Sequence, residues 1–238
     1  MFTNERFEWM SDLNVGVTFV TWFFLGFSLI LYFIGLIINY FVAWKGKTEK
    51  VYKSLLEELN NDNGYEDIKT VTLKKSQTRM PFKNYNPISK EYKVKPWELE
   101  SQNLSSVLNL FFSYILIVET REGNSKFRRS LWWMSGFHIL AFFLGVTSMI
   151  MVLATSNGLD DGTLGWIDFW LQIVNYFALG LILISWISLA FIFESVGKQM
   201  CDMAIHYLPE KEFKRFKLIV NLYAFIPLLK NPYLISKL

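Results

Sequence analysis

The sequence predicts an all-α integral membrane protein with three transmembrane helices, and three observations support this class. Apolar residues make up 52% of the 238 residues and aromatic residues 18%, whereas soluble domains contain about 45–50% apolar residues. The apolar residues are concentrated in a few long runs. All but one of the 24 Lys and Arg residues lie within residues 45–129 and 198–237, which leaves the long runs without basic side chains.

Three of the apolar segments are long enough to cross the hydrocarbon core, which takes about 20 helical residues. They are residues 15–42, 131–154 and 164–196. The connecting loop 155–163 contains acidic but no basic side chains, and residues 1–14 are acidic. Because Lys and Arg collect on the cytoplasmic side, we expect the N-terminus and this loop outside. The C-terminus and the loop 43–103 are then inside.

The aqueous and interfacial segments lie between and after these spans. In residues 43–103 the apolar spacing predicts a helix over 47–59 and a strand over 68–75. Residues 104–118 are apolar but short for a span, and the basic linker 119–130 follows them. We expect an in-plane or half-inserted helix here, although a core helix packed on the spans fits the pattern equally well. Residues 197–238 contain a cationic amphipathic pattern, which predicts a cytoplasmic helix along the inner interface.

Four aromatic residues of the cytoplasmic loop are expected to contact a partner. Three prolines prevent this stretch from forming one regular element, and the loop has no obvious core of its own. Exposed aromatic surface of this kind usually marks a protein or membrane contact. The four candidate contact residues are Phe82, Tyr85, Tyr92 and Trp97.

Polar residues within the third span are candidates for a functional site, because hydrocarbon makes unpaired polar groups costly. Asp168, Gln172 and Asn175 share one helix face by their i, i+4, i+7 spacing. They could line a hydrated path or form hydrogen bonds between helices, and we favour the second interpretation. At the inner end of the same span Glu194 precedes Lys198 by one turn, which predicts a helix ion pair.

A second candidate face lies on the second span. Its four members are His138, Ala141, Gly145 and Ser148. Ala141 and Gly145 form a small-xxx-small pair that lets two helix backbones approach closely. A histidine can also transfer protons near neutral pH, but the pattern favours packing against another helix.

No catalytic or metal-binding pattern is present in the sequence. A single cysteine, Cys201, excludes an intrachain disulfide. With His138 and His206 as its two histidines, the chain cannot make a bis-histidine haem site within the membrane unless another subunit supplies a ligand. The chain lacks HExxH, CxxC, GxSxG and a phosphate-binding glycine loop. We therefore expect no metal or cofactor, only lipid contacts, and we rank a membrane enzyme last.

The sequence thus favours a non-catalytic structural or scaffolding subunit of a larger multi-subunit membrane complex. The alternative is a transporter or ion-channel subunit whose pathway is lined by polar residues of the second and third spans. We expect other membrane subunits as partners, in a hetero-oligomer rather than a homo-oligomer. Anionic lipids should bind the basic inner face, and nucleic acid is not expected. The membrane would be a bacterial or archaeal cytoplasmic membrane or an organellar inner membrane, with most aqueous residues on the cytoplasmic side.

Overall fold

A computed structural model describes residues 5–73, 84–123, 126–155 and 161–230 of the chain. The chain divides into two compact units. The first, called the helical unit, comprises Met1–Leu31 and Trp133–Ser188. The second, called the mixed unit, comprises Tyr32–Trp132 and Leu189–Leu238.

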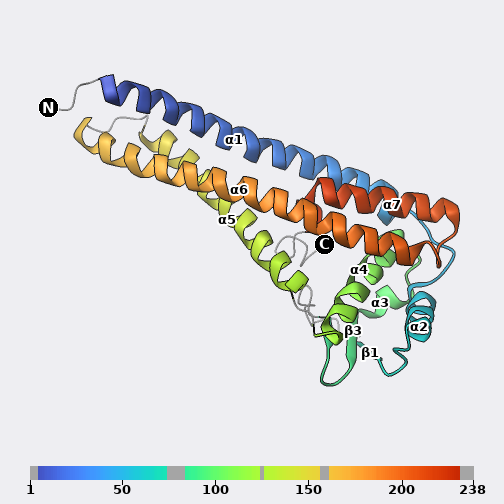
Figure 1. The fold of residues 1–238 in the computed structure, drawn as a ribbon. Helices are drawn as coiled ribbons and strands as arrows, with labels where there is room; N and C mark the ends of the chain where they lie inside the picture. Colours follow the sequence, from blue (N-terminus) through green and yellow to red (C-terminus); the bar gives the residue numbers. More distant parts are fainter. Residues whose placement is uncertain (1–4, 74–83, 124–125, 156–160, 231–238) are drawn as a thin grey trace. The chain divides into compact units, whose positions relative to one another are not determined.

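The helical unit is built from parts of three long helices, which Figure 1 shows in blue, yellow-green and orange. They are α1 (Glu5–Asn39), α5 (Lys126–Thr155) and α6 (Asp161–Ala204). Helix α1 begins at Glu5, within the segment expected as an exported tail. With 44 residues, α6 is about 66 Å long, roughly twice the thickness of a hydrocarbon core.

The buried positions of the helical unit recur at spacings of three or four residues, which is typical of helices packed side by side. They include Thr21, Leu25 and Ser28 on α1, Ser135, His138, Ala141, Gly145 and Ser148 on α5, and Leu171, Asn175, Ala178, Ile182 and Ser185 on α6. Many of these residues are small or polar. Large apolar side chains point outward instead, with Phe19 70% and Phe143 68% exposed. Small residues inside and large apolar residues outside are typical of helices that pack in lipid.

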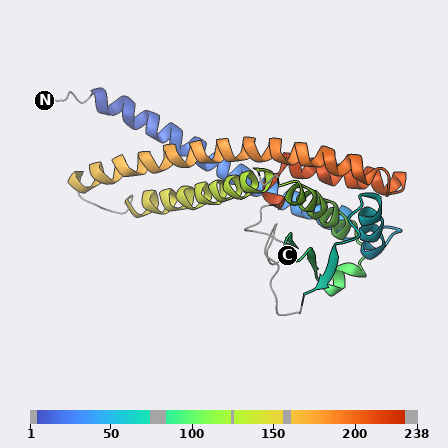
Figure 2. The same ribbon diagram turned by 60° about the horizontal axis from the view of Figure 1, so that its bottom comes forward.

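The mixed unit combines helices with a small sheet. Its elements are a π-helical segment (Tyr40–Trp44), α2 (Tyr52–Asp62), β1 (Lys69–Thr72), β2 (Tyr85–Asn86), β3 (Glu91–Val94), α3 (Pro96–Leu99), α4 (Leu104–Arg121), α7 (Glu210–Phe225) and a 3₁₀ turn (Pro227–Lys230). The strand order is β1-β3-β2, with β1 parallel and β2 antiparallel to β3. Figure 2 shows the sheet beside α2. The chain is mostly helical, at 77%. The three-stranded sheet differs from the all-α class that the sequence predicts.

Helix α4 is the central helix of the mixed unit. It packs on α2, on α7 and on the π-helical segment. The chain itself buries 67% of the 18 residues of α4, against 22–28% of an apolar 18-residue stretch in each of the other three long apolar helices. Phe111 on α4 is fully buried and meets the ring of Phe216 on α7 edge to face at 5.4 Å. Residues 104–118 thus lie inside a folded core formed by the chain's own elements.

Residues of the loop 43–103 contribute to this core, so the expectation that the loop lacks one is wrong. Strand β3 alternates half-buried and buried residues, which turns Tyr92 inward. Tyr92 and Tyr52 are both fully buried, and their hydroxyl oxygens are 2.8 Å apart. Nearby, the Tyr114 hydroxyl donates to the Leu59 carbonyl at 2.8 Å. Tyr92 was expected to contact a partner, but the chain's own core covers it.

Helix α7 also differs from the expectation of an interfacial helix. Pro209 precedes it, and two glutamates lie in its first turn, where the helix dipole favours negative charge. Its apolar side chains Phe216, Ile219, Val220 and Tyr223 are buried. The Tyr223 hydroxyl donates to Asn39 Oδ1 at 3.0 Å. Because this apolar face is packed inside the mixed unit, it is not available to insert into lipid.

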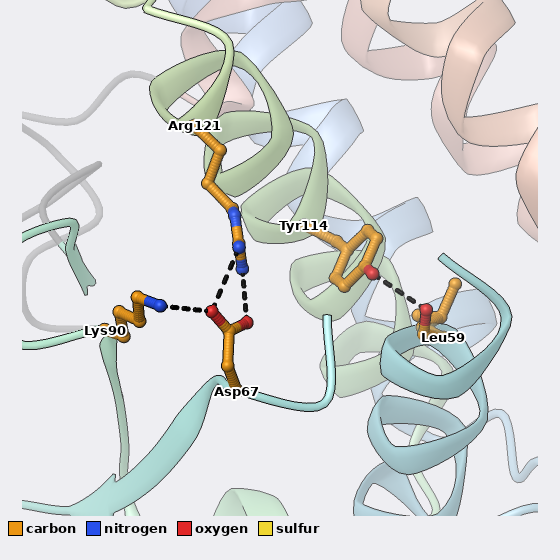
Figure 3. A network of polar contacts seen from close by, with 5 residues as sticks. All are labelled: Leu59, Asp67, Lys90, Tyr114 and Arg121. Carbon is orange, nitrogen blue, oxygen red and sulfur yellow. Dashed lines mark hydrogen bonds and ion pairs between the residues drawn. The ribbon is translucent and has the colours of Figure 1, made fainter. Parts of the chain in front are cut away.

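An ion-pair network fastens the end of α4 to the sheet, and Figure 3 shows it. The Arg121 guanidinium donates to both Asp67 carboxylate oxygens, at 2.7 and 3.1 Å. Lys90 Nζ lies 2.7 Å from Asp67 Oδ2, and the guanidinium lies over the Tyr65 ring at 4.3 Å. The hydrogen bonds from Arg121 and then Lys90 hold the pKa of Asp67 well below its usual range.

This network predicts a pH-dependent difference between the wild type and Asp67→Asn. A carboxylate with a lowered folded-state pKa stabilises the fold above its unfolded pKa of about 3.9, and this contribution is lost as pH falls toward the folded-state pKa. We expect Asp67→Asn to lower the stability of the mixed unit at pH 7, and the difference to shrink below about pH 4. Thermal unfolding from pH 7 to pH 2 measures this. Glu57→Gln is the control, because the Lys53–Glu57 pair is long at 3.9 Å and exposed; an equal effect of both substitutions at every pH contradicts the prediction.

Candidate functional site: a polar junction among the apolar helices

Asn175 joins the three helices of the helical unit, and only 1% of it is exposed. Its Oδ1 accepts a hydrogen bond from Ser148 Oγ on α5 at 2.5 Å. Its Nδ2 donates to Thr18 Oγ1 on α1 at 2.7 Å. Thr21 Oγ1 also lies 3.4 Å from the Asn175 carbonyl, although its shorter bond, at 2.8 Å, is to Val17. We call Asn175, Ser148, Thr18 and Thr21 the polar junction.

Both polar atoms of the Asn175 side chain are bonded within the polar junction. The Asn175 carboxamide oxygen is bonded to α5 and its nitrogen to α1, so the side chain is fixed in one orientation. Buried polar groups in an apolar surrounding are costly unless they are paired. Here they are paired with each other, and the arrangement therefore stabilises the contact among α1, α5 and α6.

A second buried polar contact involves His138. The ring Nδ1 lies 2.9 Å from Ser185 Oγ on α6. Because the Ser185 hydroxyl donates to the Ile182 carbonyl at 3.2 Å, its oxygen is left to accept from Nδ1–H. This tautomer leaves Nε2 as an acceptor, and Nε2 is buried without a hydrogen-bond partner in the part of the chain that the structure describes. The Trp186 ring lies edge-on to the imidazole at 6.3 Å.

The small residues Ala141 and Gly145 of α5 lie against α1. Ala141 is fully buried and forms a cluster with Leu25 and Ile182. Gly145 is also buried, and a Cβ added there would come 2.0 Å from Leu25 Cδ1. The face containing Ala141 and Gly145 is therefore in contact with the first helix.

This contact predicts that Gly145→Val destabilises the helical unit by about 1–3 kcal/mol, because the added side chain must displace Leu25. Leu25→Ala in the same chain should recover part of the loss, because it removes the atoms that clash. Unfolding by SDS in mixed micelles measures both. Gly26→Val is the control, because a Cβ at Gly26 has no atom within 4 Å. Equal losses at Gly145 and Gly26, with no rescue, contradict the packing.

The remaining residues singled out from the sequence lie apart from the polar junction. Gln172 is half-buried on α6, while the side chain of Asp168 and all of Phe82 lie outside what the structure describes. In the mixed unit Glu194 forms the expected ion pair with Lys198 at 3.0 Å, and both side chains are exposed. Tyr85 is half-buried, and Trp97 is 53% exposed.

Three partners of the polar groups were missed in the sequence: Thr18, Thr21 and Ser185. A signal was available in the sequence of α1. The alternating three- and four-residue spacing of the buried residues on α6 also occurs on α1, at Thr18, Thr21, Leu25 and Ser28. Hydroxyl residues inside spans commonly bond their own backbone, as Thr147 does to Phe143. Composition alone therefore does not distinguish a hydroxyl that bonds its own helix from one that bonds a neighbouring helix.

Across the described residues, no group of three or more His, Cys, Asp or Glu side chains could hold a metal ion. The groups at the polar junction are amides and hydroxyls that bond each other. Their chemistry is that of a hydrogen-bonded contact between helices.

Comparison with known proteins adds no relative: no protein family, curated protein or solved structure matches the chain. The class of protein is therefore assigned from its helices alone. The protein is mostly helical, and four of its described helices are long and apolar enough to cross a membrane. Several such helices indicate association with a membrane.

Proposed function

We propose that the chain is a non-catalytic structural subunit of a larger multi-subunit membrane complex. The observation that best supports this is the closed bonding of Asn175 to Ser148 and Thr18. Polar groups that satisfy each other across three helices stabilise a bundle, whereas a conduction pathway needs polar groups that exchange with water or ions. The interior of the helical unit therefore favours a packed core.

The topology proposed for this subunit has three spans, α1, α5 and α6, with the N-terminus outside and the C-terminus inside. The distribution of Lys and Arg supports the orientation. The burial of α4 supports its exclusion from the spans, because its surface is already covered by the chain. Its final residue also bonds the exposed Asp67 of the cytoplasmic loop.

Labelling of introduced cysteines tests this topology in a Cys201→Ser background. Cysteines at Thr3 and Asn157 should react with an impermeant maleimide added from outside, and a cysteine at Ser76 should react only after the membrane is opened. The reverse pattern would overturn the orientation.

Assembly with other subunits is proposed because three spans are too few to enclose a solute pathway. Phe19, Phe23 and Phe27 form an exposed apolar row along α1, which lipid or a helix of a partner subunit would cover. Native mass spectrometry of the chain extracted from its own membrane in mild detergent tests the proposal. We expect a defined hetero-oligomer; a monomer or a homo-oligomer contradicts it.

A proton-conducting subunit is the second candidate, and His138 is the observation that favours it. Its Nε2 is buried, without a partner in the described chain, and oriented by Ser185. A proton pathway assembled with other subunits could use such an acceptor. In vesicles containing the purified native complex, loss of proton flux in His138→Gln with the complex intact would favour this candidate over the structural one.

A further inference from the structure

The mixed unit contains a groove between helix α2 and the segment that includes β1. It encloses about 490 Å³. Its lining residues are Lys53, Leu56, Glu57, Asn60, Asn61, Glu66, Ile68, Thr70 and Leu99. The floor is apolar, with Leu56 2% and Ile68 7% exposed. The rim is polar and charged.

Strand β1 presents an open edge beside this groove. Its backbone bonds to β3 come from alternate residues, because Lys69 N–H donates to the Lys90 carbonyl and Leu73 N–H to the Val94 carbonyl, each at 2.9 Å. The N–H and C=O groups of Thr70 and Thr72 consequently point to the opposite edge. Among the described residues no strand pairs with that edge. An unpaired edge of this kind is a template for another strand.

Asn60 supplies a second, independent indication of a ligand. The residue is 8% exposed and lines the groove. Its Oδ1 is buried and has no hydrogen-bond partner in the described chain. A buried carboxamide oxygen without a partner is costly, and a rotation of the Asn60 side chain toward the groove would let a donor of a bound ligand remove that cost.

We propose that this groove binds an extended peptide segment of a partner protein, which adds to the sheet as a strand beside β1. The main chain of the peptide would bond Thr70 and Thr72. Alternate side chains of an added strand point to the same face of the sheet, so every second side chain would enter the groove above Leu56 and Ile68. This is the general mode of strand addition, in which backbone bonds provide affinity and side-chain pockets provide specificity.

The charges at the rim indicate the chemistry of the peptide. The lining contains two glutamates and one lysine. Lys53 and Glu57 form a long, exposed pair at 3.9 Å, and none of the ion pairs among the described residues involves Glu66. The preferred peptide therefore alternates apolar residues with at least one Lys or Arg placed near Glu66. The groove lies in the mixed unit, so this proposal does not depend on the role of the polar junction.

A displayed library of random linear nonapeptides, selected on the full chain in lipid nanodiscs, supplies the probe. We expect enriched peptides with alternating apolar residues and a basic residue. The most enriched peptide, made synthetically, should slow hydrogen exchange at Thr70 and Thr72, while the amides already bonded to β3 change little. Failure to enrich any peptide, or protection elsewhere on the chain, overturns the proposal.

Substitutions at Thr70 separate edge binding from other contacts. Thr70→Pro removes an N–H that β3 does not use, so the fold should persist while peptide affinity falls about tenfold or more. Thr70→Val keeps the N–H and should bind nearly as the wild type. Asn60→Leu should also weaken binding, because it removes the carboxamide. Equal affinity of Thr70→Pro and Thr70→Val overturns the proposal, and so does a chain that self-associates through this edge without binding peptide.

Discussion

Phe111→Ala is expected to unfold much of the mixed unit, with a loss of about 3–5 kcal/mol. The ring is fully buried and packs against Phe216 on α7 and Tyr207 after α6. Removing it leaves a cavity at the point where α4 meets the C-terminal part of the chain. Because domains are stable by only about 5–15 kcal/mol, this is a large fraction of the total.

Hydrogen exchange of the α2 and α7 amides measures the effect. Phe225→Ala is the matched control, because Phe225 also belongs to α7 but is 65% exposed. Faster exchange in both helices with Phe111→Ala alone is the expected result. Unchanged protection of α7 would show that α4 and α7 do not share a core.

Asn175→Leu is expected to destabilise the helical unit by about 1–3 kcal/mol, since hydrogen bonds between apolar helices contribute roughly 0.6–1.7 kcal/mol each. The substitution removes two such bonds and leaves the Ser148 and Thr18 hydroxyls without their carboxamide partner. Unfolding of the full chain by SDS measures the loss.

Neighbouring residues provide controls for Asn175. Ser148→Ala should show part of the same loss, because it removes one of the two bonds. Thr147→Val should cause little loss of stability, because among the described residues that exposed hydroxyl bonds the Phe143 carbonyl of its own helix. If Thr147→Val costs as much as Ser148→Ala, the bonds between helices do not explain the stability.

The long apolar helices could be predicted from the sequence because length and the absence of charge identify them directly. Their ends could not, since the helices continue past the apolar runs. Helix α6, for example, extends to Ala204 through Glu194 and Lys198, which pair with each other on the helix surface. Hydropathy reports only the part of a helix that is apolar.

The core of the mixed unit was not predictable in the same way. Tyr92 lies in a proline-containing, charged stretch, and it is buried only because Tyr52 and its neighbours come from a different part of the loop. The apolar face of α7 suggested lipid as its partner, but residues as distant in sequence as Phe111 cover it. Amphipathic spacing identifies a face that is buried without identifying what buries it.

The polar junction was partly predictable. Asn175 and Ser148 were singled out on separate helices, whereas their meeting point and the contribution of Thr18 depend on how three helices are aligned. Spacing along one helix defines a face, and the alignment between helices is set by packing of small residues such as Gly145 against Leu25.

Accessibility of Ser148 to water tests most directly whether the polar junction is a packed contact. Ser148→Cys in a Cys201→Ser background places a thiol of similar size beside Asn175. In native membranes a water-soluble thiosulfonate reagent, applied from either side, should leave this cysteine unmodified, while Lys214→Cys on the exposed face of α7 reacts once the reagent reaches it. Reaction at residue 148 from either side would show that water enters the junction, and it would contradict a structural role in favour of a pathway.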